Sequence, residues 1–236
     1  MSAIRPPSPY KSSIDRSAVL VFGALYGLAL LRFADPLIAA LLGGFHEPVP
    51  ALAILAGLFA GYLLADFVAG TVHWIADRHF DPGTPAIGPM LIEPFRAHHD
   101  DPLSITRHDF FEVLGNNALV TIPAVLALLT APRPGSVLAL FGVALALAGS
   151  FAAVATNLFH AWAHAPRPPR VARWLQARHL VLTPAGHARH HRGAHDRAYC
   201  VTSGWLNPLL DRTRFFGRLD AWIARGKPTP GHATPR

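Results

Sequence analysis

The stretch Val137 to His164, VLALFGVALALAGSFAAVATNLFHAWAH, is apolar almost throughout and ends in two histidines. A helix needs about 20 residues, at about 1.5 Å each, to cross the roughly 30 Å hydrocarbon core of a bilayer. This stretch is long enough and contains no Asp, Glu, Lys or Arg. It therefore predicts a membrane-spanning helix that ends with His160 and His164 one turn apart on the same face.

Three other apolar blocks lie along the chain, at 17–42, 51–74 and 117–130. The second block carries Gly57 and Gly61, a small-xxx-small pair typical of close helix contacts in membranes. The third is short and contains Pro123, which predicts a tilted or re-entrant segment. Brief, turn-rich linkers join the blocks into two hairpins. The sequence therefore predicts an all-α integral membrane protein with about four transmembrane helices.

The ends of the apolar blocks suggest the domain boundaries. Residues 1–16 contain several Pro and Ser residues and are expected to form a disordered leader. Residues 17–225 are expected to form a membrane domain with a histidine-rich cap, followed by a disordered tail at 226–236. A single cysteine, Cys200, excludes an intramolecular disulfide.

The charge of the chain is low in amount and uneven in distribution. Charged residues make up 15% of the chain, against a norm of about 25%, and the net charge is +7. Most of the basic residues lie after Ala165, which indicates a face turned toward an anionic membrane surface. Nucleic acid is the other partner that a basic tail can indicate, but no nucleic-acid-binding motif accompanies this one.

The histidine clusters all fall on one side of the predicted membrane. The second block ends at His73, the third follows His98, and the fourth ends at His164. The hairpin tips hold one arginine, Arg133, so the positive-inside rule places the histidine-rich face and both termini in the cytoplasm. The Ala- and Arg-rich composition suggests a bacterial source and hence the bacterial cytoplasmic membrane.

Most of the 14 histidines stand at helix-compatible spacings. In GHARHH, His187, His190 and His191 are at i, i+3 and i+4, and FRAHHDD adds His98 and His99. One helix can present two imidazoles to a metal at such spacings, and adjacent histidines can serve two metals. Neutral imidazole suits zinc, copper, iron and nickel. Eight or more convergent histidines exceed the three or four protein ligands of a single zinc site, which favours two metals.

A solvated basic tail is the alternative interpretation of residues 187–195. It does not explain why predicted membrane helices end in histidines. One of these, His73, lies on a helical stripe with Asp66, Gly70 and Asp77. The glycine in this stripe leaves room for another segment to approach closely.

Together these motifs resemble a known family. H-x3-H followed by H-x2-HH on a four-helix membrane scaffold is similar to the integral-membrane fatty acyl desaturases and hydroxylases. The chain more closely resembles the plasmanylethanolamine desaturase family, also called Kua or CarF-like. The matching segments run in family order from Ala65 to Asp211: ADFVAGTVHWIAD, IEPFRAHHDDPLSITRHDFFEVLGNN, TNLFHAWAH, LQARHLVLTPAGHARHH and AHDRAYCVTSGWLNPLLD. One departure is Gly115-Asn116-Asn117, where the family usually has Gly-Asp-Asn.

The resemblance implies a non-haem di-iron centre that uses dioxygen to convert a 1-O-alkyl phospholipid, such as plasmanylethanolamine, into its vinyl ether, a plasmalogen. The chain has no G-x-G-x-x-G fingerprint, so we expect an external electron donor of ferredoxin or cytochrome b5 type with its reductase. An acyl-chain phospholipid or fatty acid desaturase is the main alternative. A zinc-dependent membrane lipid hydrolase would need about three histidines, and a metal transporter would place its ligands near the bilayer midplane.

The resemblance also implies the site residues. The implied metal ligands are His73, His98, His99, His160, His164, His187, His190 and His191. Asp77 and Asn157 are implied in catalysis, with Asp77 either a ligand or the partner of a histidine. Further ligand or supporting candidates are His108, His179 and His195. Three arginines, Arg189, Arg192 and Arg197, are expected to hold a lipid headgroup or to dock the electron donor.

Overall fold

The computed structural model describes residues 9–44 and 46–225, and within them the regular secondary structure is helical, without a strand. Four helices are long and apolar enough to cross a membrane: α1 (Pro9–Gly43), α2 (Pro48–Arg78), α4 (Phe110–Thr130) and α5 (Val137–His164). The predicted all-α integral membrane fold is therefore confirmed.

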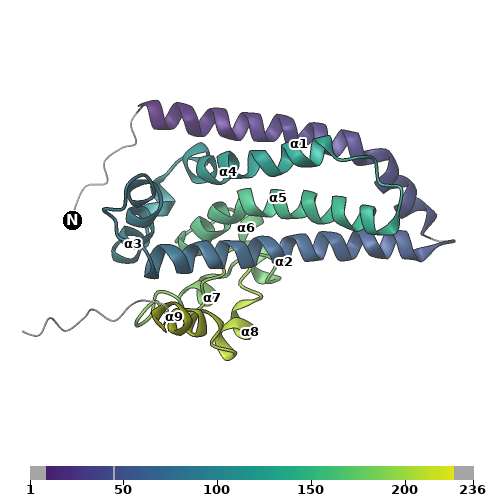
Figure 1. Ribbon diagram of the computed structural model, residues 1–236. Helices are drawn as coiled ribbons and strands as arrows, with labels where there is room; N and C mark the ends of the chain where they lie inside the picture. Colours follow the sequence, from purple (N-terminus) through teal and green to yellow (C-terminus); the bar gives the residue numbers. More distant parts are fainter. Residues whose placement is uncertain (1–8, 45, 226–236) are drawn as a thin grey trace, which may run out of the picture.

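The four long helices lie side by side in the order α1, α4, α5, α2 (Figure 1). Helix α1 packs on α4, α4 on α5, and α5 on α2. Helices α1 and α2 are consecutive in sequence but occupy opposite edges of this layer. They meet near their connection, where Leu37 and Ala40 pack close to Ile54.

Two glycines set the close packing of α2 on α5. A Cβ atom at Gly57 would lie 2.4 Å from the carbonyl oxygen of Phe141, and one at Gly61 would lie 2.2 Å from that of Leu145. Any side chain at these positions would push the two helices apart. The helix contact predicted from the small-xxx-small pair is thus confirmed, and α5 is its partner.

Helix α4 begins seven residues earlier than the apolar block indicates and is 21 residues long, enough to span a bilayer. The expectation of a short segment was wrong because the first turns of α4 carry polar residues. Asp109 caps this end by accepting hydrogen bonds from the backbone N–H groups of Phe111 and Glu112, and the Glu112 side chain accepts one from the Asp109 N–H. This is a capping box, which fixes the start of a helix. Pro123 lies inside the helix without ending it.

Helix α1 also begins earlier than expected, at Pro9. Residues 9–16 are helical, so the predicted disordered leader is wrong over that part. Lys11 pairs with Asp15 one turn later, and Asp15 packs against Gly115 of α4, which holds this part of the helix in place. Residues 1–8 of the predicted leader and the predicted tail at 226–236 lie outside the described residues.

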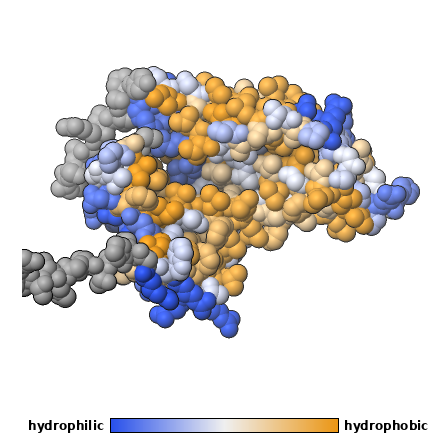
Figure 2. All heavy atoms as spheres, in the orientation of Figure 1, coloured by the Kyte–Doolittle hydropathy of each residue, from blue (hydrophilic) through white to orange (hydrophobic). Residues whose placement is uncertain are grey.

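Short helices form a cap at the end of the bundle where α2 and α5 end. They are η1 (a π-helix, Gly88–Ile92), α3 (Glu93–Asp100), η2 (a 3-10 helix, Ser104–Arg107), α6 (Arg170–Ala177), α7 (Pro184–His187), α8 (Asn207–Arg212) and α9 (Phe215–Arg225). Figure 2 shows apolar residues covering the long helices, while hydrophilic residues gather at the two ends and over α8 and α9. This distribution is that of a bundle whose middle is embedded in lipid.

Candidate metal centre

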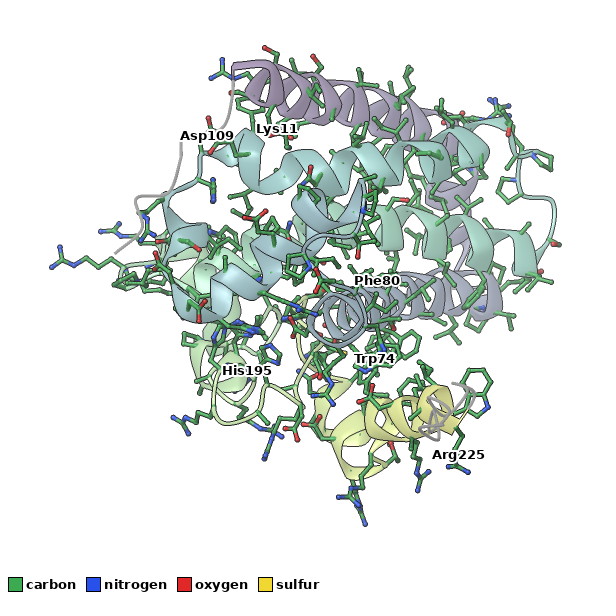
Figure 3. All side chains as sticks on the ribbon, turned by 60° about the vertical axis from the view of Figure 1, so that its left-hand side comes forward. Lys11, Trp74, Phe80, Asp109, His195 and Arg225 are labelled. Atoms are coloured by element: carbon green, nitrogen blue, oxygen red, sulfur yellow. The ribbon has the colours of Figure 1, made fainter. Side chains whose placement is uncertain are left out.

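Histidines from four segments converge at the capped end of the bundle. Helix α2 contributes His73 and Asp77, and α5 contributes His160 and His164, each pair one turn apart. Helix α3 contributes two adjacent histidines, and three more lie in and just after α7. Figure 3 shows this end of the bundle, with His195 beside the cluster and Lys11 on α1 farther away.

These side chains form two groups, in each of which the candidate ligand atoms all lie within 4.8 Å of one another. We call the first the five-histidine group: His98, His160, His164, His187 and His191. We call the second the aspartate group: His73, Asp77, His99 and His190. The structure therefore brings together every histidine that the sequence analysis named as a metal ligand, with Asp77 among them. Each adjacent pair, 98–99 and 190–191, contributes one ring to each group.

In the five-histidine group the ring nitrogens approach one another closely. The Nε2 atom of His187 lies 2.8 Å from Nε2 of His160 and 3.0 Å from Nε2 of His191. The Nε2 atoms of His98 and His164 are 2.9 Å apart. Two ligands at right angles around one ion, each about 2.1 Å from it, lie about 3 Å apart. The spacing of these nitrogens fits a shared metal ion.

In the aspartate group a buried carboxylate faces three imidazoles. Oδ2 of Asp77 lies 3.5 Å from Nε2 of His73, 3.7 Å from that of His99 and 3.4 Å from that of His190. The Asp77 side chain is 4% exposed. These separations lie between the about 3 Å and about 4.2 Å expected for adjacent and opposite ligands of one ion.

Backbone carbonyls fix the orientation of two rings in the aspartate group. The Nδ1 atom of His73 contacts the Tyr199 carbonyl at 3.2 Å, and Nδ1 of His190 contacts the Arg197 carbonyl at 2.8 Å. A carbonyl accepts a hydrogen bond and cannot donate one, so each Nδ1 carries the proton. The Nε2 lone pairs then point into the group, which is the tautomer that a metal requires.

The pKa values of three rings outside the membrane helices, those of His98, His99 and His191, are lowered so that the neutral form is favoured. Burial, reinforced by neighbouring imidazoles, lowers the pKa of His98 to about 2 and that of His191 to about 3. Burial also lowers the pKa of His99 to about 4, even though the Asp77 carboxylate acts in the opposite direction. Neutral imidazole is the form that donates a lone pair to a metal.

Buried polar atoms without a partner provide a further test of metal binding. Among the described residues, neither carboxylate oxygen of Asp77 has a hydrogen-bond partner, and the same holds for Nε2 of His73. A buried carboxylate without a partner is strongly unfavourable. A cation between these atoms would satisfy both side chains, so the residues fit a metal ion.

The loop after α7 is attached to α2 by a second carboxylate, whose role the sequence analysis did not identify. Asp66 is fully buried and its Oδ1 accepts hydrogen bonds from the backbone N–H groups of Thr202, Ser203 and Gly204. An acidic residue inside an apolar block was the signal for such a role, because a charge within a membrane helix needs partners. Asp66 thereby holds the loop whose carbonyls orient the rings of the aspartate group.

Gly70, on the same stripe of α2, lets this loop approach. A Cβ atom at Gly70 would lie 2.6 Å from the Sγ atom of Cys200 and 3.1 Å from its backbone nitrogen. The close approach that the stripe predicts is therefore confirmed. The helix-compatible spacing of His187, His190 and His191 does not correspond to one helix, because α7 ends at His187, His190 lies in a turn and His191 lies in a bend.

The remaining candidates lie outside the two groups. The ring of His195 stacks on that of His99, with centroids 4.1 Å apart and planes 6° apart. His108 pairs with Glu112, and its Nδ1 lies 3.1 Å from Oε2 of that residue. His179 is exposed on the cap, and it belongs to neither group. Asn157 is also outside both groups, and its side-chain amide donates to the Asn117 side chain at 3.4 Å.

The three arginines have different surroundings. Arg189 forms an ion pair with Asp211 at 2.9 Å, which links the turn after α7 to α8. Arg197 lies beside Asp196, with Nε 3.4 Å from Oδ1, and Arg192 is exposed. Docking of a headgroup or an electron donor by these arginines stays a prediction.

A pocket of about 500 Å³ opens onto the five-histidine group. His98 and His160 lie on its wall, together with Asn157, which was named from the sequence. Apolar side chains such as Val72 and Phe95 line much of the rest. Its other polar residues include Lys11, Asp15, Glu112, Asn116 and Asn117. The departure from the family pattern at Asn116 thus lies on the wall of this pocket.

The fold and the site define a histidine-rich integral membrane protein with two neighbouring groups that can each hold a metal ion. Residues 62–229 match the lipid desaturase domain family. This match covers more than half of the chain, so the protein belongs to the lipid desaturase domain family. The family resemblance inferred from the histidine motifs is confirmed.

Several characterised proteins are similar in sequence. The chain is 42% identical over 174 residues to a plasmanylethanolamine desaturase of Myxococcus xanthus, covering 72% of this chain and 61% of that protein. It is 38% identical over 187 residues to plasmanylethanolamine desaturase 1 of Mus musculus, covering 75% and 66%. It is 36% identical over 182 residues to the chloroplastic fatty acid desaturase 4 of Arabidopsis thaliana, covering 76% and 54%. The chain thus spans between about half and two thirds of the length of these relatives. No solved structure matches it.

Proposed function

We propose that this protein is a membrane lipid desaturase that holds two iron ions and uses dioxygen to convert a 1-O-alkyl phospholipid, such as plasmanylethanolamine, into its vinyl ether. The observation that carries the proposal is the pair of neighbouring metal-binding groups, one of which borders a pocket. Two of the similar proteins carry the name plasmanylethanolamine desaturase, which supports the same conclusion.

The donor set is compatible with iron. The two groups offer eight imidazoles and one carboxylate, and the single cysteine belongs to neither group. Nitrogen and carboxylate donors without a thiolate suit non-haem iron, as they also suit several other transition metals. When bound, a pair of irons supplies the oxidising power to break unactivated C–H bonds with dioxygen.

The reaction removes one hydrogen from each of two adjacent carbons beside the ether oxygen. One alkyl ether, one dioxygen, two electrons and two protons give one vinyl ether and two water molecules. Because the substrate supplies half of the four electrons that dioxygen needs, the other two must come from an external donor. A ferredoxin or a cytochrome b5 type carrier with its reductase fits this requirement.

The residues of the chain would bind the lipid, orient it and exclude water. His98 and His160 reach both the pocket and the metal position, so a carbon in the pocket would lie next to the five-histidine group. Phe95 and the other apolar wall residues keep water from this carbon. Asn157 lies one turn before His160 and donates a hydrogen bond at the pocket wall, so it would position the substrate. Asp77 would balance the positive charge of the bound metal.

The proposed location is the cytoplasmic membrane of a bacterium, with the histidine-rich cap and both termini on the cytoplasmic side. The distribution of basic residues supports this orientation, because most of them lie in the cap and the hairpin tips carry a single arginine, Arg133. In this orientation the exposed Arg192 and the neighbouring Arg197 face the compartment of a soluble electron donor.

An acyl-chain phospholipid desaturase is the second candidate, and the similarity to a fatty acid desaturase of Arabidopsis thaliana favours it. The pocket favours the ether substrate. Polar side chains lie in the same cavity as the five-histidine group, which suits a substrate whose reacting carbons are close to its headgroup. A zinc-dependent hydrolase would need only one metal site, so it would not explain the second of the two groups.

Expression in a host that contains 1-O-alkyl phospholipids but no vinyl ether lipids tests the proposal. We expect about two irons per purified chain, and we expect lipid mass spectrometry to detect acid-labile vinyl ethers in cells that carry the gene. A new acyl double bond without any vinyl ether would establish the second candidate instead. A single zinc ion without any new unsaturation would refute both desaturase candidates.

A further inference from the structure

The pocket beside the five-histidine group has a charged end that the metal chemistry does not use. Lys11 and Asp15 lie on its wall, one turn apart near the start of α1. The ammonium group of Lys11 also contacts the side-chain oxygen of Asn116 at 3.0 Å. Two charged side chains in a cavity that also reaches a metal group indicate a binding site for a polar ligand.

The Asp15 side chain is buried in the wall of this pocket. Its side chain is 2% exposed, although it is ionisable and lies near the end of the bundle. It reaches this place because Gly115 of α4 has no side chain: a Cβ atom there would lie 2.3 Å from Oδ1 of Asp15. Its partner Lys11 is 39% exposed and has a long, flexible stem, so it can turn toward a ligand.

The charges around the pocket do not favour an anionic ligand. Among the lining residues that the structure describes, Lys11 is the single lysine or arginine, whereas Asp15 and Glu112 are both carboxylates. Glu112 is engaged by the Asp109 N–H and by His108. Lys11 and Asp15 form an adjacent pair of a cation and an anion, which complements a ligand that also carries one charge of each sign.

The proposed reaction places a lipid headgroup near this pair. The vinyl ether forms next to the ether oxygen, and its first carbon is six bonds, or about 7 Å, from the phosphorus atom. Asn157 lies one turn before His160 and contacts Asn117. The neighbouring Asn116 contacts Lys11. Residues of the pocket wall therefore link the metal group to the charged pair.

We propose that Lys11 and Asp15 form a headgroup site for a phosphoethanolamine lipid. The ammonium of Lys11 contacts the phosphate, and the carboxylate of Asp15 contacts the ammonium of the headgroup. The inference rests on the proposed function, because it assigns residues of the same pocket to the headgroup of the proposed substrate. An anionic phosphoglycerol headgroup has no ammonium and meets a site without surplus positive charge.

Competition between two lipids tests this site. The probes are 1-O-alkyl-2-acyl phosphoethanolamine and the phosphoglycerol lipid with the same chains, offered together to the metal-free full chain in nanodiscs. Native mass spectrometry then gives the ratio of bound lipids. We expect Asp15→Asn to lower the ethanolamine-to-glycerol ratio about tenfold, because it removes one charge-assisted contact without changing the shape of the side chain.

Asn116→Asp is expected to change the ratio in the opposite direction. A carboxylate at this position lies close to the Lys11 ammonium, weakens its hold on a phosphate and disfavours the anionic lipid most. We expect the ratio to rise about threefold. Asn116 is exposed, so this variant decides the question if Asp15→Asn fails to fold, as judged by its thermal unfolding. Asp35→Asn is the matched control, because Asp35 is an exposed carboxylate in the second half of α1, and its ratio should equal that of the wild type.

The outcomes separate this inference from the proposed function. Ratios within twofold of the wild type in both pocket variants would overturn the headgroup site, even if the iron-loaded protein makes vinyl ethers. Opposite shifts in the two variants would support it. If the iron-loaded wild type forms no vinyl ether while the binding ratios shift as described, the proposed reaction is wrong and the headgroup site stands.

Discussion

The two metal groups lie side by side, but the chain holds them in different ways. The five-histidine group has nitrogen ligands alone and borders the pocket through His98 and His160. The aspartate group has a buried carboxylate, and its rings are oriented by carbonyls of the loop after α7. The same loop is attached to α2 by hydrogen bonds to Asp66.

The two groups therefore differ in role: in the proposed reaction the five-histidine group is close to the substrate, and the aspartate group is held in place by backbone contacts. In the proposed reaction, a substrate carbon approaches the group that borders the pocket, whereas the aspartate group would supply negative charge to its metal ion and is supported by the fold. Changes to a ring of the five-histidine group should therefore abolish turnover directly. Substitutions of residues that support the aspartate group should instead lower its metal occupancy and the stability of the loop after α7.

His164→Ala is expected to have the largest effect. Nε2 of His164 lies 2.9 Å from that of His98, so the substitution removes one ligand from the five-histidine group. We expect vinyl ether formation to fall at least about 100-fold, because a lost direct ligand exceeds the 10–100-fold typical of outer partners. Membrane insertion should be unchanged. His46→Ala, an exposed histidine near the connection of α1 and α2, is the control. Wild-type product levels in His164→Ala would remove this residue from the metal site.

Asp77→Asn should produce the next largest effect. The amide keeps the shape of the side chain but removes the negative charge that faces three imidazoles. We expect the iron content to fall from about two toward one per chain, with a loss of activity of about 10–100-fold. Asp100→Asn, an exposed carboxylate next to His99 in sequence, should retain both irons. Full iron content in Asp77→Asn would mean that the imidazoles alone hold the second ion.

Asp66→Asn tests the support behind the aspartate group. The substitution leaves both metal groups intact but weakens the hydrogen bonds that Asp66 accepts from Thr202, Ser203 and Gly204. We expect a lower thermal unfolding midpoint, equivalent to about 2–3 kcal/mol, because charged acceptors contribute about 1.5–3 kcal/mol per bond. Iron should be lost from the aspartate group first. Equal loss from both groups would show that the loop supports the whole cap.

The sequence predicted the parts of this molecule that depend on local chemistry. Apolar length predicts the long helices, and the spacing of His160 and His164 predicts a shared helix face. The start of α4 was missed because its first turns are polar and the capping box at Asp109 sets the boundary instead of hydropathy. The helical start of α1 was missed for a similar reason, since the contact of Asp15 with Gly115 is tertiary.

The sequence predicted which residues form the candidate site. It did not predict how they divide into two groups. Adjacent histidines indicate two metals, but the spacing does not show which member of each pair serves which group. That division depends on how α3 and the loop after α7 meet α2 and α5. The carbonyl partners at Arg197 and Tyr199 have no side-chain signature at all, because any residue can supply them.

Gly70→Ala is expected to have the smallest effect, and it tests whether the loop after α7 supports the aspartate group alone. The added Cβ atom would lie 2.6 Å from Sγ of Cys200 and 3.1 Å from its backbone nitrogen, so the loop must shift away from α2. We expect a loss of stability of about 1–3 kcal/mol, typical of overpacking, with weaker iron binding in the aspartate group alone. Gly142→Ala in α5 is the matched control, because a Cβ atom there meets nothing within 4 Å and alanine favours the helix. If both variants keep the same iron content and unfolding midpoint, the loop has freedom to move, and its carbonyls do not set the geometry of the aspartate group.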